Sequence, residues 1–119
     1  MDAYDLIISV IALNPDYSNA VKNEGLINRT EFTKRVLSKY PDEILKGAGI
    51  RVHEIHGDSA VFEKTMNELI RNKVLKYWAD DSLQWDFPLT PREYFYTHIK
   101  QSLKDEERSK LEQFVLSLR

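Results

Sequence analysis

The chain has 119 residues, of which 42% are hydrophobic and 30% are charged, and its formal net charge is −2. This length suits one domain with a single core, so we expect residues 1–119 to form one unit. The chain has no cysteine, which excludes disulfides, thiolate metal sites and cysteine nucleophiles. It also has no apolar run of the about 20 residues that a membrane span needs and no secretory leader pattern. We therefore expect a cytoplasmic protein without membrane contact.

Three helices are expected in the first 40 residues. Residues 4–13 are apolar on nearly every side and predict a well-buried helix that ends before Pro15. A shorter helix is expected within residues 16–24. Asn28 begins a third helix, because Glu31 stands three residues later in the spacing of a capping box. The apolar face of this helix recurs at helical spacing and comprises Phe32, Val36, Leu37 and Tyr40.

The middle of the chain predicts a strand followed by a helix. Residues 50–55 alternate apolar and polar side chains, which indicates a short strand. Gly57 ends this strand, and Asp58 or Ser59 can cap the next helix. That helix covers residues 58–73. Its expected buried stripe comprises Phe62, Met66, Leu69 and Ile70.

A hairpin and two helices complete the expected order. Residues 74–78 and 83–87 are β-prone, and the polar residues between them form a turn. Thr90, Pro91 and Glu93 give a strong helix start, and this helix should extend to about residue 103. Residues 105–118 predict a final helix with acids in its first turn. The expected fold class is therefore mainly α with a short β-hairpin.

The order helix, helix, hairpin, helix between about residues 28 and 103 resembles a winged helix-turn-helix DNA-binding domain. The resemblance lies in the pattern Phe62-x3-Met66-x2-Leu69-Ile70-x3-Val74-Leu75, which is followed by the hairpin and by Leu89-Thr90. It implies a winged helix-like core with extra N- and C-terminal helices. Two features depart from the pattern: the segment 41–57 is long, and the tip of the wing carries Asp80 and Asp81 rather than a base.

The resemblance also implies a DNA-contacting face. Residues 58–73 would be the recognition helix, in which Asn67 and Arg71 suit base edges, Lys64 suits a phosphate, and Ser59 also faces outward. Residues 22–51 carry seven bases and four acids, a net of +3, and form the one positive segment of the chain. The bases of its helix are the expected phosphate patch. The predicted DNA-binding residues are Ser59, Lys64, Asn67, Arg71, Lys34, Arg35 and Lys39.

Catalysis and metal binding find little support. His53 and His56 would point to opposite sides of the expected strand, which opposes shared metal ligation. The chain contains no nucleophile elbow and no glycine-rich phosphate loop. We therefore expect no enzyme activity, no cofactor and no metal.

Residues 91–119 are a candidate helical pair for dimerisation. The last helix has a narrow apolar stripe flanked by charges, which is typical of a helix that meets another helix. Either a homodimer or the chain's own N-terminal helix could cover the stripe; we favour the homodimer, because the aromatic residues 94–96 cannot all face one core. The predicted interface comprises Leu111, Phe114, Val115 and Leu118.

The leading hypothesis is a small dimeric transcription regulator that binds duplex DNA. The alternative is a winged-helix-like module that binds a protein partner, as an adaptor or assembly subunit without DNA binding. The acidic net charge and the acidic wing favour this alternative.

Overall fold

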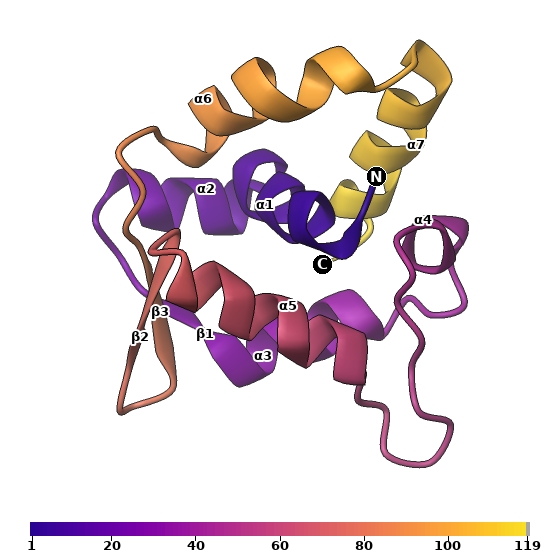
Figure 1. The fold of residues 1–119 in the computed structure, drawn as a ribbon, viewed down its shortest axis with the longest axis horizontal. Helices are drawn as coiled ribbons and strands as arrows, with labels where there is room; N and C mark the ends of the chain where they lie inside the picture. The colour runs from indigo at the N-terminus through magenta and orange to yellow at the C-terminus, as the bar shows by residue number, and fades with distance from the viewer. Residues whose placement is uncertain (119) are drawn as a thin grey trace.

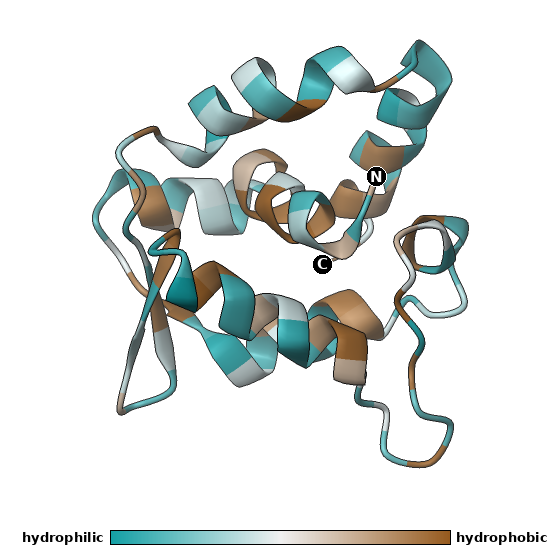
Figure 2. Cartoon of the chain, viewed as in Figure 1, coloured by the Kyte–Doolittle hydropathy of each residue, from teal (hydrophilic) through white to brown (hydrophobic). Residues whose placement is uncertain are grey.

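A buried helix lies at the centre of the structure (Figure 1). This computed structural model describes residues 1–118. Helix α1, Ala3–Leu13, contacts α2, α5, α6 and α7, and every residue from Leu6 to Ala12 is buried. In Figure 2 this helix is mostly hydrophobic, whereas the helices around it alternate between hydrophobic and hydrophilic residues. Residues 4–13 therefore form the well-buried helix that their apolar pattern predicts.

The remaining elements wrap around α1. Before the hairpin these are α2, Pro15–Lys22; β1, Ile27–Asn28; α3, Arg29–Leu37; α4, Glu43–Gly47; and α5, Ala60–Arg71. The hairpin consists of β2, Leu75–Trp78, and β3, Ser82–Trp85. The segments after it are α6, Pro91–Tyr94; the π-helix η1, Phe95–Ile99; the 3-10 helix η2, Lys100–Ser102; and α7, Asp105–Leu116. The structure is thus mainly helical with a small sheet, and no helix in the described part of the chain is long and apolar enough to cross a membrane.

The three strands form an antiparallel sheet in the order β1-β3-β2. The expected hairpin is confirmed, with Leu75 opposite Trp85 and Trp78 opposite Ser82. Strand β1 was not expected; it pairs with β3 so that Ile27 lies opposite Leu83. Leu75, Leu83 and Ile27 are all buried, so the sheet closes one end of the core.

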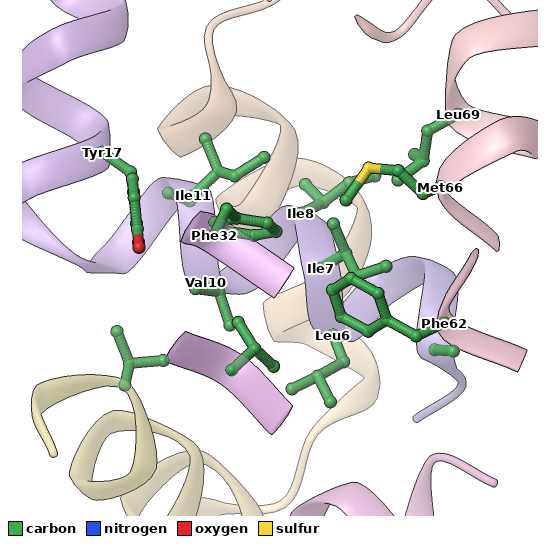
Figure 3. Packing of buried hydrophobic residues seen from close by; sticks show 14 of the residues in the cluster. Leu6, Ile7, Ile8, Val10, Ile11, Tyr17, Phe32, Phe62, Met66 and Leu69 are labelled. Carbon is green, nitrogen blue, oxygen red and sulfur yellow. The ribbon is translucent and has the colours of Figure 1, made fainter. Parts of the chain in front are cut away.

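Helix α5 has the facing that its sequence predicts, although Ile70 of the expected stripe is half-buried instead of buried. Phe62, Met66 and Leu69 are fully buried, and Figure 3 shows Phe62 and Met66 pointing toward Ile7 and Ile8 of α1. The three α5 residues repeat at helical spacing, so one face of the helix covers α1. The opposite face is left exposed to solvent.

The strand predicted at residues 50–55 is wrong. Residues 51–59 form a loop that follows the buried Ile50, and Ile55 at its tip is 84% exposed. The loop closes on itself, because the backbone N–H of His53 donates to Asp58 O at 2.6 Å and that of Gly57 donates to His53 O at 2.8 Å. No neighbouring strand is available in the described structure, so the alternation of apolar residues could not produce one.

The aromatic run at the start of the helical segment 91–102 divides between core and solvent. Phe95 is buried, Tyr94 is half-buried and Tyr96 is exposed. The segment continues from α6 through η1 and η2, which confirms a helical stretch that reaches almost to residue 103. The expectation that at least one of the three aromatic residues is exposed is also confirmed.

The apolar stripe of α7 faces the core of its own chain. Leu111, Phe114, Val115 and Leu118 are between 0% and 4% exposed, and α7 contacts α1 and α4. The side-chain N–H of Asn14 also donates to Val115 O at 3.3 Å. These four residues therefore cannot form a dimer surface in the intact fold, and that site prediction is wrong. The physical reason is that α1 is apolar on all sides and needs α7 as cover.

The facing of α5 predicts the effect of truncating its stripe. Leu69→Ala should lower the free energy of unfolding by about 2–5 kcal/mol, because it leaves a cavity against α1. The matched control is Leu116→Ala, since Leu116 is 53% exposed on α7, and it should change stability by less than about 0.5 kcal/mol. Urea titrations followed by circular dichroism measure both values. Equal losses in the two variants would contradict this facing.

Candidate nucleic-acid interface

The exposed face of α5 carries three of the predicted DNA-binding residues. Lys64, Asn67 and Arg71 are all exposed, and their spacing of three and four residues places them on one face of the helix. Glu68 borders the same face, because it lies four residues after Lys64 and three before Arg71, and it opposes a phosphate. The face therefore offers two cations, an amide and one bordering carboxylate to a partner.

Ser59 is not part of this face. It is 2% exposed, and its hydroxyl accepts the backbone N–H of Phe62 at 3.2 Å as the N-cap of α5. The prediction that Ser59 points outward is wrong, because the hydroxyl satisfies one of the amides that the first turn of a helix leaves unpaired.

The predicted phosphate patch on and after α3 loses one of its members. The guanidinium of Arg35 donates to Asp16 Oδ2 at 3.2 Å and to Glu31 Oε1 at 3.4 Å, and it lies over the ring of Tyr17 at 5.5 Å. Two carboxylates compensate its charge, so Arg35 joins α3 to α2 instead of facing a phosphate. Lys34 and Lys39 are exposed, and neither forms an ion pair within residues 1–118.

Arg29 also belongs to the candidate site, although the sequence pattern did not indicate it. Its Nη2 donates to Glu63 Oε2 at 2.8 Å and to Asn67 Oδ1 at 3.0 Å. The same guanidinium lies 5.0 Å from the ring centre of Tyr77, and the side chain is 14% exposed. Arg29 therefore joins α3, α5 and β2 at one point and compensates the charge of Glu63.

Asp81, at the tip of the hairpin, caps α3. Its carboxylate accepts the backbone N–H of Thr30 at 3.1 Å and also the Thr30 hydroxyl. The hydroxyl of Tyr77 donates to the same carboxylate at 2.7 Å, and the Arg29 N–H donates to Asp81 O at 2.9 Å. We call Arg29, Thr30, Tyr77 and Asp81 the hairpin lock. The hairpin lock explains one of the two acids at the tip of the hairpin, because a carboxylate at a helix N-terminus is stabilising.

The hairpin lock shifts the ionisation of its members. The hydrogen bond from the Thr30 hydroxyl, followed by the one from Tyr77, holds the pKa of the Asp81 carboxyl below its ordinary value. The hydrogen bond to Asp81 raises the pKa of Tyr77 above its ordinary value. Both shifts favour a charged Asp81 beside a neutral phenol.

The contact with Arg29 restricts what Asn67 can recognise. An arginine only donates hydrogen bonds, so the Asn67 atom that faces Arg29 is the amide oxygen. Bidentate recognition of adenine needs both the oxygen and the NH2 group of an asparagine. With its oxygen occupied, Asn67 keeps its NH2 group as a donor to a base acceptor or a phosphate.

The outer face of the hairpin presents a cation and an aromatic ring. Lys76 Nζ lies 4.1 Å from the ring centre of Trp78, and Trp78 is 42% exposed. Residues two apart on a strand share a face, so this pair lies opposite the Tyr77 side that meets Arg29. Lys76 therefore presents its charge on the face of the hairpin that points away from Arg29.

The histidines of the 51–59 loop are neighbours. The rings of His53 and His56 stack with their centres 4.7 Å apart, and both residues are exposed. The argument that they point to opposite sides is wrong, because no strand forms there. His53 Nδ1 accepts the backbone N–H groups of Ile55 and His56, each at 3.2 Å, so this nitrogen shapes the loop.

Comparisons of the chain with protein family models, with curated proteins and with solved structures found no match. What this surface can bind therefore follows from the geometry of its own residues. That geometry brings Lys64, Asn67 and Arg71 together with a hairpin held in place, and it removes Ser59 and Arg35 from the candidate set.

The hairpin lock predicts a pH-dependent contribution to stability. Because the pKa of Asp81 is lowered in the fold, its contribution is present above the ordinary pKa of an aspartate and is lost as the pH falls through the lowered value. Asp81→Asn should lower the free energy of unfolding at pH 7 and reduce the further loss of stability on acidification.

The neighbouring residue supplies the control for this experiment. Asp80 is exposed and forms no side-chain hydrogen bond or ion pair in the described structure. Urea titrations at about pH 7 and about pH 3 of the two Asp→Asn variants measure the difference. The role of Asp81 is contradicted if Asp80→Asn and Asp81→Asn show the same stability at both pH values.

Proposed function

We propose that the protein binds duplex DNA and that α5 is the recognition helix of a winged helix domain. The observation that carries the proposal is the exposed line of Lys64, Asn67 and Arg71 on a rigidly packed helix beside a fixed hairpin. Helices of this kind fit the major groove, where side chains contact base edges and phosphates.

The topology supports the proposal. Within the order α1, α2, β1, α3, α4, α5, β2, β3, helices α3 and α5 followed by the β2-β3 hairpin have the helix, helix, hairpin order of the winged helix arrangement that the sequence resembles, and β1 adds a third strand to the hairpin. The long segment between α3 and α5 is taken up by α4 and by the 51–59 loop. This insertion leaves the contact between α3 and α5 in place, because Arg29 still bonds to Glu63 and Asn67.

Each exposed residue receives a role in this proposal. Arg71 is suited to bidentate recognition of guanine, and Lys64 to a phosphate. Asn67 donates a single hydrogen bond from its NH2 group. Lys34 and Lys39 contribute to phosphate binding at longer range. We extend the proposal to a role as a small transcription regulator in the cytoplasm. This role requires no dimer through α7, since the apolar stripe of α7 is buried in the core of its own chain.

A protein-binding module is the second candidate, and one observation favours it. Ile55 is 84% exposed at the tip of the 51–59 loop, and that loop is held by its own backbone hydrogen bonds. A large exposed apolar side chain on an ordered loop suits a partner pocket. The net charge of −2 also suits this candidate better than DNA binding.

The DNA proposal predicts salt-dependent binding that depends on α5. Fluorescence anisotropy with a duplex of random sequence should show an affinity that falls linearly with salt on logarithmic axes. Lys64→Ala should weaken binding on all sequences and reduce the salt slope by about 1. Arg71→Ala should cost about 1–3 kcal/mol on a selected sequence, if Arg71 bonds a guanine.

The control is Lys104→Ala. Lys104 is exposed directly before α7, and α7 begins at the upper right of Figure 1, whereas α5 lies in the lower half, so this variant should bind like the wild type. Absence of binding at about 50 mM salt would reject the DNA proposal and leave the protein-binding module. Equal losses in Lys64→Ala and Lys104→Ala would reject α5 as the contact helix.

A further inference from the structure

A cleft of about 740 Å³ lies away from the exposed face of α5. It is bounded by the end of α2, by the end of β3 and by the start of α6. Figure 1 shows the chain leaving β3 and passing α2 on its way to α6. Volumes of about 300–1,000 Å³ are usual for sites that bind small molecules.

The apolar wall of the cleft is preformed. The indole of Trp85 is held by a hydrogen bond from its Nε1 to Leu89 O at 2.7 Å. The ring of Phe87 packs edge-on against Tyr94, with centres 5.5 Å apart. Pro88 and Pro91 also line the cleft and have fixed φ angles. A ligand that binds here would pay little for ordering these groups.

Two cations border the same cleft from different elements. Lys22 belongs to α2 and Arg92 to α6, and neither forms an ion pair within residues 1–118. The nearest aromatic ring to the Arg92 guanidinium is that of Tyr96, at 6.0 Å from its centre. Glu24 is the one acid among the described lining residues, so the lining has a net charge of +1.

We propose that this cleft binds a small organic anion with a planar, apolar body. The planar body would lie against Trp85 and Phe87, and the anionic group would lie between Lys22 and Arg92. Aromatic stacking and hydrogen bonds from a guanidinium to an anion suit this combination of groups. The site is separate from Lys64 and Arg71, so the proposal stands whether or not the protein binds DNA.

The two tryptophans of the chain allow a direct test. Trp85 lines the cleft, whereas the indole N–H of Trp78 donates to Gln84 Oε1 at 3.2 Å and Gln84 also lines the cleft. Their indole N–H signals in a nitrogen-15 NMR spectrum are therefore a direct and an indirect probe of the site. Titration of the full chain with 2-naphthoate should shift the Trp85 signal saturably, with a Kd of about 1 mM or tighter. The Trp78 signal should shift less than the Trp85 signal, because Trp78 meets the cleft only through Gln84. The neutral analogue 2-naphthamide should bind at least about threefold more weakly.

Charge-removing variants test the two cations. Lys22→Gln and Arg92→Gln should each raise the Kd for 2-naphthoate by about threefold to tenfold, whereas Lys104→Gln should leave it unchanged. Lack of a saturable Trp85 shift up to about 10 mM 2-naphthoate overturns the proposal. Equal affinities for the acid and the amide, or equal effects of the three variants, overturn the anion site. A saturable Trp85 shift with inorganic phosphate of the same size and affinity overturns the role of the apolar wall.

Discussion

The cover that α1 requires determines the rest of the structure. A helix that is apolar on all sides gains stability only when other elements remove every face of it from water. Helices α2, α5, α6 and α7 provide this cover. Helix α7 is thereby committed to the core, and α5 is fixed with one face inward, which leaves its Lys64 side for a partner. The orientation of the candidate interface is thus a consequence of packing on α1.

Much of the fold is encoded locally and could be predicted from the sequence. The N-caps Asn28 and Thr90 and the paired β-prone runs define helix starts and a hairpin within a few residues. Strand β1 could not be predicted, because its two residues become a strand only by pairing with β3, which is distant in the sequence. The alternation at residues 50–55 predicted a strand that does not form, because an alternating segment becomes a strand only when a neighbouring strand pairs with it.

In the candidate site, too, some features follow from local sequence and others depend on residues far apart in the chain. Helical spacing correctly places Lys64, Asn67 and Arg71 on the surface, because the inward stripe fixes the outward one. Spacing cannot reveal which charges are compensated by residues far along the chain. Arg35 is paired with Asp16 and Arg29 with Glu63, and these ion pairs exist only after the helices pack. A sequence signal for Arg29 is absent, because its partners are 34 and 38 residues away.

The strand order β1-β3-β2 leaves one side of β2 without a neighbour. Unpaired backbone groups on such an edge invite pairing with another chain, and the exposed rings of Tyr77 and Trp78 would add to the attraction. Two features counter this tendency: β2 has only four residues, and the exposed Lys76 stands in its middle, where a second copy would have to bury an ammonium group. The same lysine that packs on the ring of Trp78 thus also protects the sheet from edge-to-edge aggregation.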